Sequence, residues 1–95
     1  MQEKYYIVRG NRSGVYFGRI TERNGEEVTM ADARILWYWK GAETTLEIAV
    51  AGVKEPGSCK FSVAVDEITI TDAIAIIPCT AEAVKIIKGV KEWKR

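Results

Sequence analysis

The sequence predicts an α+β domain: a small, twisted antiparallel sheet with one short helix and a C-terminal amphipathic helix. Short runs rich in β-branched and aromatic residues are separated by glycine-containing turns, as in a meander of strands. The longest segment with a helical period lies after residue 80. Two similar segments forty residues apart suggest two related β-bend-β units, with barrel-like closure left open. The length of 95 residues predicts a single domain, 1–95.

The first two strands are predicted to flank a tight connection. The run KYYIVR (residues 4–9) has strand composition, and GNRSG supplies turn-forming residues directly after it. The β pattern resumes in VYFGRITER and ends at Asn24-Gly25, a dipeptide that fits a type I′ turn. The second strand therefore turns back at this point into EEVTM.

The third strand is predicted to bend at Asp32 before it continues as ARILWYWK. The segments EVTMADARIL and EITITDAIAI match at Glu, Thr, Asp and Ala. If this repeat is real, Asp32 and Asp72 both accept hydrogen bonds from backbone N–H groups in their bends. The alternative is a chance likeness between two β-rich segments. In either case both carboxylates are interpreted as structural.

A short helix is predicted over residues 45–51. Thr44 and Glu47 have the spacing of a capping box, and Gly52 ends the segment. The residues expected on its buried face are Leu46, Ala49 and Val50.

The second half returns to strands after the turn at Pro56-Gly57. KFSVAV and EITI alternate, whereas AIAIIP is continuously apolar, as in a strand buried on both faces. Thr80 is the predicted N-cap of the last helix. Its core face is expected to hold Ala83, Ile86, Ile87 and Val90, opposite the solvent-facing residues Lys85, Lys88 and Lys91.

Composition argues against several classes of function. Fourteen basic and thirteen acidic residues leave a net charge of +1, too little to attract nucleic acid generally. The chain has no histidine, which removes the commonest metal ligand and general base, so we expect neither catalysis nor a metal or other cofactor. Neither a leader nor a membrane span is recognised, which predicts a cytoplasmic protein. Cys59 and Cys79 are then reduced thiols that serve as small buried residues.

The candidate site lies where arginines and aromatic rings meet. Five of the six arginines fall within the first 34 residues. Alternation along residues 34–40 places Trp37 and Trp39 on one face, predicted to be core, and Arg34 and Tyr38 on the other, predicted to face solvent. An ordinary surface ion pair is the alternative role for Arg34. The predicted ligand-binding residues are Arg9, Tyr16, Arg34, Trp37, Tyr38 and Trp39.

Several segments resemble a family of short, uncharacterised proteins carried by tailed bacteriophages and prophages. They are IVRGNRSGVYFGRI, VTMADARILWYWKGA, LEIAVAGV and ITDAIAIIPCTAEAVKII. The resemblance covers most of the chain and departs from the family pattern at Leu36. It implies a phage-encoded accessory protein in the host cytoplasm, and it brings no activity with it.

The leading functional hypothesis is a protein that binds and sequesters a nucleotide-type ligand, such as a cyclic nucleotide or an ADP-ribose-like immune signal. Arginines would hold the phosphates and an aromatic ring would stack on the base. This would counter host defence without catalysis.

The alternative is a protein-binding module: an inhibitor of a host protein or a small virion or assembly component. Its hot spot would be formed by Tyr5, Tyr6, Tyr16 and Phe17. A single-stranded nucleic-acid binder is a third, weaker hypothesis. A homo-oligomer is also expected, because a chain this short with so many early aromatic residues gains core by pairing.

Overall fold

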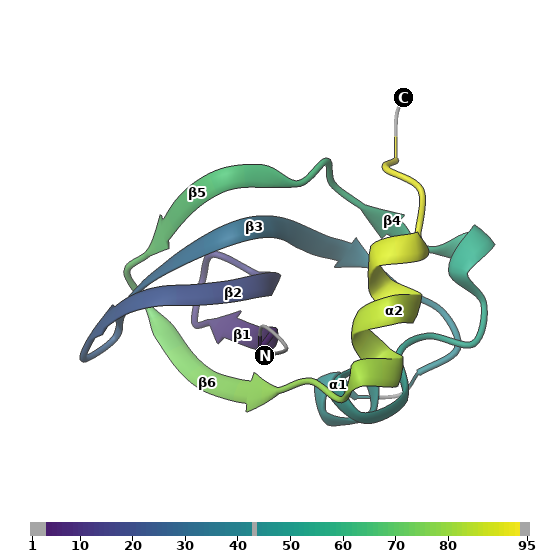
Figure 1. Cartoon of the computed structure of the whole chain (residues 1–95), viewed down its shortest axis with the longest axis horizontal. Coiled ribbons are helices and arrows are strands. Elements are labelled where there is room, and N and C mark those ends of the chain that lie inside the picture. Colours follow the sequence, from purple (N-terminus) through teal and green to yellow (C-terminus); the bar gives the residue numbers. More distant parts are fainter. Residues whose placement is uncertain (1–3, 43, 94–95) are drawn as a thin grey trace.

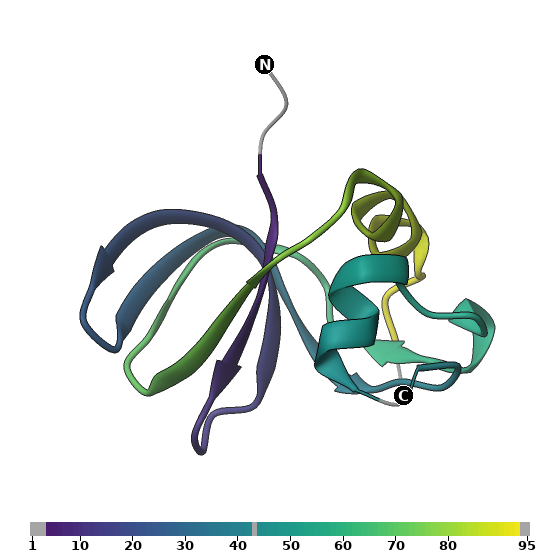
Figure 2. The same cartoon turned by 90° about the horizontal axis from the view of Figure 1, so that it is seen from below.

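A computed structural model describes residues 4–42 and 44–93, and it confirms the α+β class. Figure 1 shows a curved antiparallel sheet with both helices gathered at one end of it. Figure 2, turned by 90°, shows the same separation between the curled sheet and the helices. The elements in chain order are β1 (Tyr6–Gly10), β2 (Val15–Asn24), β3 (Glu27–Tyr38), α1 (Thr45–Ala51), the 3-10 turn η1 (Pro56–Ser58), β4 (Lys60–Phe61), β5 (Val65–Ile70), β6 (Ala73–Pro78) and α2 (Ala81–Gly89).

The spatial order of the sheet is β6-β1-β2-β3, and the far edge of β3 is shared by two strands. β5 pairs with the first half of β3, where Thr29 lies opposite Thr69. β4 pairs with its last residues, where Leu36 lies opposite Phe61. Within the described residues no pairing joins β5 to β6, so the sheet is open and the barrel-like closure is not formed.

The hairpin between β2 and β3 turns one residue later than predicted. Asn24 pairs with Glu27, which leaves Gly25 and Glu26 at the centre of the turn. Only Gly25 of these two has a positive φ, 64°, and this is the pattern of a type II′ turn rather than type I′. Glycine is favoured here because an L side chain would be strained at that angle.

Two clusters of buried residues lie on opposite faces of the sheet. One fills the space between the sheet and the helices, and it includes the stacked rings of Tyr5 and Phe17, 5.0 Å apart. The other lies within the curl and includes Val8, Tyr16 and Met30. The aromatic cluster expected to bind a protein partner is therefore largely internal, since Tyr5, Tyr16 and Phe17 are all buried. That prediction of an exposed hot spot is wrong.

The first helix is confirmed at both ends, and of its predicted buried face Ala49 is confirmed while Leu46 and Val50 are wrong. The backbone N–H of Glu47 donates to Thr44 Oγ1 at 3.2 Å, and Gly52 ends the helix with a φ of 74°. The fully buried residues are Ile48 and Ala49, whereas Leu46 and Val50 are about three-fifths exposed (61% and 62%). Two helical turns with apolar residues on every side carry too little periodicity to choose a face.

The C-terminal helix is confirmed in its cap and in most of its buried face. Thr80 Oγ1 accepts a hydrogen bond from the backbone N–H of Ala83 at 3.1 Å. Ala83, Ile87 and Val90 are buried, and Ile86 is partly buried against the same cluster. Within the described residues, no helix is long and apolar enough to cross a membrane.

The strand β6 differs from the expectation of burial on both faces. It lies at the edge of the sheet beside β1, and the side chain of Ile74 is 53% exposed. The continuous apolar run of residues 73–78 had predicted a central strand. The prediction is wrong because β6 has only one neighbouring strand, β1.

The two bends of the repeat use their carboxylates differently. Asp72 accepts hydrogen bonds from the backbone N–H of Arg12 at 2.7 Å and from Ser13 Oγ at 2.6 Å, in the β1–β2 loop rather than in its own bend. Asp32 has a positive φ of 50° and accepts from the hydroxyl of Tyr5 at 2.6 Å. Both residues are structural, but the prediction that Asp32 binds backbone N–H groups is wrong.

Replacing Asp72 with asparagine is expected to destabilise the protein at neutral pH only. The hydrogen bond from the Ser13 hydroxyl, followed by that from the Arg12 backbone, lowers the pKa of Asp72. A lowered folded-state pKa stabilises the fold above the unfolded pKa of about 3.9, and this stabilisation is lost as the pH falls through the folded value. The urea midpoint of Asp72→Asn should thus lie below that of the wild type at about pH 7 and approach it at about pH 2.

The matched control for this measurement is Asp66→Asn, which changes an exposed carboxylate on β5. It should leave the midpoint unchanged at both pH values. An equal loss for Asp72→Asn at both pH values would show that the ionised carboxylate is not what holds the loop.

Both cysteines are free thiols, Cys59 buried and Cys79 half-buried. Burial raises the pKa of the Cys79 thiol to about 12, so the thiol is protonated at neutral pH. A protonated thiol is a poor nucleophile and a poor metal ligand, in line with a packing role.

Candidate functional site

The guanidinium of Arg34 lies inside the protein, so its predicted exposure is wrong. The residue is 8% exposed, and its Nε donates to the carbonyl of Ser62 at 2.8 Å. One terminal nitrogen donates to the carbonyls of Ile87 and Val90, at 3.1 and 2.9 Å. The guanidinium carbon also lies 5.4 Å from the ring centre of Phe61. Arg34 therefore ties β3 to the end of α2.

The electrostatics of Arg34 agree with this structural role. Burial lowers its pKa, and the negative charges of Glu92 and Asp32 oppose that shift. Arginine starts from so high a pKa that it keeps its charge in proteins. The last carbonyls of a helix have no partner within the helix, and the charged guanidinium supplies donors for them.

The predicted alternation holds from Arg34 to Trp37, but the two faces are reversed. Leu36 shares the helix-covered face with Arg34 and is 2% exposed. Trp37 lies on the opposite face and is 58% exposed, so its predicted role in the core is wrong. Trp39 follows the strand and is partly buried against the helix-side cluster, so its core role is confirmed, but the prediction that it shares a face with Trp37 is wrong.

The remaining predicted site residues do not converge on one place. Tyr16 is buried and its hydroxyl donates to the carbonyl of Ser13 at 2.8 Å, so its ring is not an open platform. Arg9 is exposed on the face of β1 that also carries Ile7, which is opposite to the face of Trp37. Tyr38 is 48% exposed next to Trp37. Of the six predicted site residues, only Trp37 and Tyr38 share an exposed surface.

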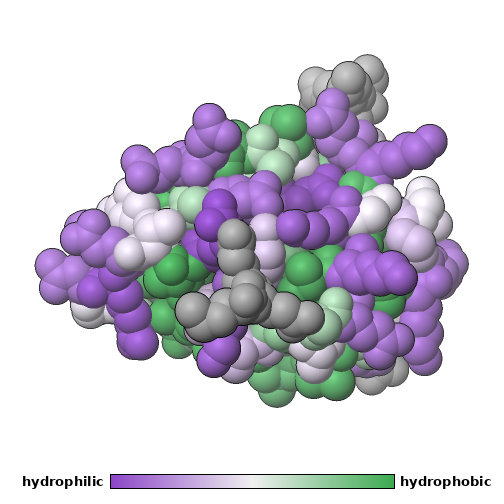
Figure 3. Space-filling model, in the orientation of Figure 1, coloured by the Kyte–Doolittle hydropathy of each residue, from purple (hydrophilic) through white to green (hydrophobic). Residues whose placement is uncertain are grey.

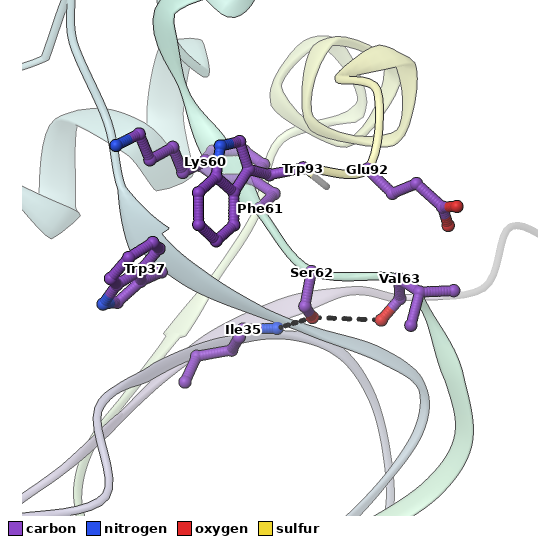
Figure 4. A pocket seen from close by; sticks show the side chains of 8 residues that line it. All are labelled: Ile35, Trp37, Lys60, Phe61, Ser62, Val63, Glu92 and Trp93. Atoms are coloured by element: carbon purple, nitrogen blue, oxygen red, sulfur yellow. Dashed lines mark hydrogen bonds between the residues drawn. The ribbon is translucent and has the colours of Figure 1, made fainter. Parts of the chain in front are cut away.

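A groove opens beside the exposed ring of Trp37, and we call it the tryptophan groove (Figure 4). It has a volume of about 500 Å³ and is walled by the end of β3, by β4 with the residues after it, and by the segment that follows α2. The rings of Trp37 and Trp93 lie 4.7 Å apart at an angle of 49°. Its lining residues are Ile35, Trp37, Lys60, Phe61, Ser62, Val63, Glu92 and Trp93.

The C-terminal wall of the groove is held by main-chain contacts to β4. The backbone N–H of Trp93 donates to the carbonyl of Phe61 at 2.8 Å, and Glu92 forms an isolated bridge with Phe61. This places the indole of Trp93 against Trp37, although the two residues are distant in sequence. The carboxylate of Glu92 points away from the two rings (Figure 4).

One cation lies among the rings of the groove. The ammonium nitrogen of Lys60 lies 5.1 Å from the ring centre of Trp93, 5.4 Å from that of Trp37 and 5.7 Å from that of Tyr38. These distances are within the range of cation–π attraction, which fixes the ammonium at the edge of an apolar surface. A ligand on the tryptophans would therefore find a positive charge beside it.

The hydroxyl of Ser62 in this groove is already used by the fold. It accepts from the backbone N–H of Ile35 at 2.8 Å and donates to the carbonyl of Val63 at 3.0 Å (Figure 4). Both partners of this hydroxyl are main-chain groups, so its hydrogen bonds hold the strand end in place. The groove is equipped for stacking and charge, which is binding chemistry.

A second depression of about 650 Å³ lies along α2 and carries three lysines. Its Lys88 is 4.4 Å from the ring centre of Tyr5 and 3.8 Å from a carboxylate oxygen of Asp32. The aromatic ring on its wall, that of Tyr5, is buried. The tryptophan groove, with its exposed ring, is therefore the stronger candidate despite its smaller volume.

Sequence reasoning missed Lys60, Val63 and Trp93. The alternating pattern at residues 60–65 predicted a strand, but it gave no reason to place Lys60 near aromatic rings. Trp93 follows the last helix, and no spacing in the sequence relates it to Trp37. A tryptophan in a polar tail was the one available signal, because a ring of that size usually finds a surface to cover.

Comparisons with known proteins give one match. A family model described as a domain of unknown function, DUF6948, matches residues 3–87. No curated protein and no solved structure matches the chain. The matched range includes Trp37, Lys60 and Phe61, and it ends before Trp93.

Proposed function

We propose that this chain, which belongs to the DUF6948 family, a domain of unknown function, is a binding protein without catalysis. Its tryptophan groove holds a nucleotide-type ligand. The observation that carries this proposal is the pair of tryptophan rings with the Lys60 ammonium beside them. A base can stack on the exposed ring of Trp37. The phosphate of the same ligand can then reach Lys60.

The size and lining of the groove support a small ligand. Its volume of about 500 Å³ lies within the usual range of small-molecule sites, roughly 300 to 1,000 Å³. Such sites are mostly apolar with a few polar groups, and here Lys60 and Glu92 are the charged groups among apolar and aromatic walls. The arginine forks expected for the phosphates are replaced in this proposal by one lysine, because Arg34 is committed to carbonyl groups.

We infer a phage-encoded accessory protein that sequesters a cyclic nucleotide or an ADP-ribose-like immune signal in the host cytoplasm. The support for this setting is the resemblance of its segments to short phage and prophage proteins. Sequestration requires only tight binding, and a groove with stacking rings beside a positive charge fits that requirement.

A second candidate function is a protein-binding module that uses the same groove. The observation that favours it is the further exposed apolar surface beside the tryptophans, on Tyr38, Val63 and Val65. Exposed tryptophan and tyrosine are enriched among the residues that dominate protein interfaces. A ligand larger than a nucleotide would cover these residues as well.

Trp37→Ala is expected to weaken nucleotide binding by roughly 5- to 150-fold, the range of one stacked base. Because Trp37 is exposed, the loss of its ring should change the free energy of unfolding little. Isothermal titration with cyclic mononucleotides, cyclic dinucleotides and ADP-ribose measures the affinity, and tryptophan fluorescence gives an independent signal.

Matched controls separate the groove from the rest of the surface. Leu46→Ala removes an equally exposed apolar side chain on α1 and should leave the affinity unchanged. Lys60→Gln should weaken binding and reduce its salt dependence, whereas Lys85→Gln on α2 should do neither. Absence of heat with every ligand, at protein well above micromolar concentration, would contradict a nucleotide site and leave the protein-binding module.

A further inference from the structure

Three lysines from two parts of the chain meet at the depression along α2. Lys85 and Lys88 lie one helical turn apart on α2, and Lys4 comes before β1. Their side chains are exposed, whereas the lining residues Cys79 and Val84 are partly buried. The depression therefore has an apolar floor and positive charges around its rim. Figure 3 shows hydrophilic side chains over α2 on this side of the molecule.

The period of α2 brings several of the lining residues together. Ala81, Val84, Lys85 and Lys88 recur at the spacing of one helix face. The core face of α2, which carries the fully buried Ile87, is a different one. The predicted exposure of Lys85 and Lys88 is confirmed, and the structure adds that both lysines border a depression.

Lys88 is held in place before any ligand arrives. Its ammonium nitrogen lies 4.4 Å from the ring centre of Tyr5 and 3.8 Å from Oδ2 of Asp32. The same carboxylate oxygen accepts a hydrogen bond from the hydroxyl of Tyr5 at 2.6 Å. Because the ring and the carboxylate fix the ammonium, less side-chain freedom is lost when it binds an anion.

The charges around the depression do not balance. Lys4 and Lys85 form no ion pair with any other residue that the structure describes, Glu82 one turn before Lys85 included. Asp32 offsets the charge of Lys88, but no acid is among the described residues that line the depression. A cleft lined by charges of one sign concentrates ions of the opposite sign.

We propose that this depression binds a small phosphate monoester, with its terminal phosphate at the three lysines. Such a phosphate carries about 1.5 to 2 negative charges at neutral pH and has three oxygens that accept hydrogen bonds. Each ammonium offers three donors, so Lys4, Lys85 and Lys88 can each bond a phosphate oxygen. The organic part of the ligand then lies on Cys79 and Val84. The volume of about 650 Å³ is within the range of small-molecule sites, roughly 300 to 1,000 Å³.

This site is independent of the proposed function. Among the described residues, the depression shares none of its lining with the tryptophan groove. The ligands considered for the groove, cyclic nucleotides and ADP-ribose, carry no terminal phosphate. Lys85→Gln is therefore expected to leave their binding unchanged while it weakens the binding of a phosphate monoester.

Butyl phosphate is the probe that tests this proposal, because its alkyl chain suits an apolar floor and cannot stack on Trp37 as a base does. In titrations followed by ¹H–¹⁵N spectra, the amides of residues 79–88 should shift in a saturable way at millimolar concentrations. Butyl sulfate, which has the same chain and one negative charge, should bind at least about fivefold more weakly. Added salt should weaken the phosphate complex, because exposed charges are screened.

Lys4→Gln and Lys85→Gln each remove one charge from the rim, and neither side chain forms an ion pair with another described residue. Each variant should raise the dissociation constant of butyl phosphate about two- to fivefold, as expected for an exposed charge pair. Lys91→Gln is the matched control, since it lowers the net charge equally and lies outside the depression. It should leave the affinity unchanged.

Several outcomes would overturn the proposal. They are the absence of saturable shifts, equal affinity for butyl phosphate and butyl sulfate, and an equal loss of binding in Lys91→Gln. Shifts confined to the surroundings of Trp37 would place the phosphate in the tryptophan groove instead. Binding to vesicles that contain phosphatidate, without a response to butyl phosphate, would indicate a lipid surface rather than a small ligand and would equally refute the site.

Discussion

Phe61→Ala is expected to lower the free energy of unfolding by about 3 to 5 kcal/mol. Phe61 is fully buried in the cluster between the sheet and the helices. Removing its ring takes apolar surface out of the core, leaves a cavity and removes the aromatic face next to the Arg34 guanidinium. Urea denaturation, with the midpoint and slope fitted separately, measures this loss.

Val63→Ala is the control for that measurement. Val63 lies two residues further along the same segment and is 55% exposed, so its truncation should change stability by no more than about 0.5 kcal/mol. A loss below about 1 kcal/mol for Phe61→Ala, well under the usual cost of such a truncation, would mean that β4 and the end of α2 do not share a packed core.

Arg34→Ala is expected to cost about 3 kcal/mol of stability, since each hydrogen bond from a charged donor contributes about 1.5 to 3 kcal/mol. The carbonyls of Ser62, Ile87 and Val90 lose their hydrogen bonds to the guanidinium, and the end of α2 loses its tie to β3. Arg34→Lys should recover little, because one ammonium cannot replace a planar group that serves three carbonyls in fixed directions.

Arg23→Ala, which removes an exposed arginine from β2, is the matched control and should leave stability nearly unchanged. A loss of less than about 0.5 kcal/mol for Arg34→Ala would restore the original expectation of an exposed side chain at this position. The difference in stability between Arg34→Ala and Arg23→Ala therefore distinguishes a structural guanidinium from a solvated one.

Local signals in the sequence were sufficient wherever the structure is decided locally. The caps at Thr44 and Thr80 depend on residues three positions away, and both helices begin where those caps predict. Alternation along β3 likewise depends only on neighbouring residues, and it correctly separated Arg34 from Trp37.

The sequence could not show which face of β3 points inward. That choice depends on α2, whose carbonyls at Ile87 and Val90 follow Arg34 by 53 and 56 residues. An arginine at the end of a strand is usually solvated, so its burial required knowledge of the helix end that it serves. For the same reason the exposed ring of Trp37 was assigned to the core, and the buried guanidinium of Arg34 was assigned to the solvent-facing side.

The tryptophan groove lies only partly within the residues that the family model matches. Trp37, Lys60 and Phe61 fall inside the residues that the DUF6948 model matches, whereas Trp93 lies beyond residue 87, where the match ends. Trp93 is joined to the sheet through its backbone bond to Phe61, a contact that is independent of side-chain identity. Substitution at this position would therefore exchange one wall of the groove without disturbing the shared scaffold. If the proposed groove binds a ligand, its preference could thus be altered at residue 93 alone, with the sheet left intact.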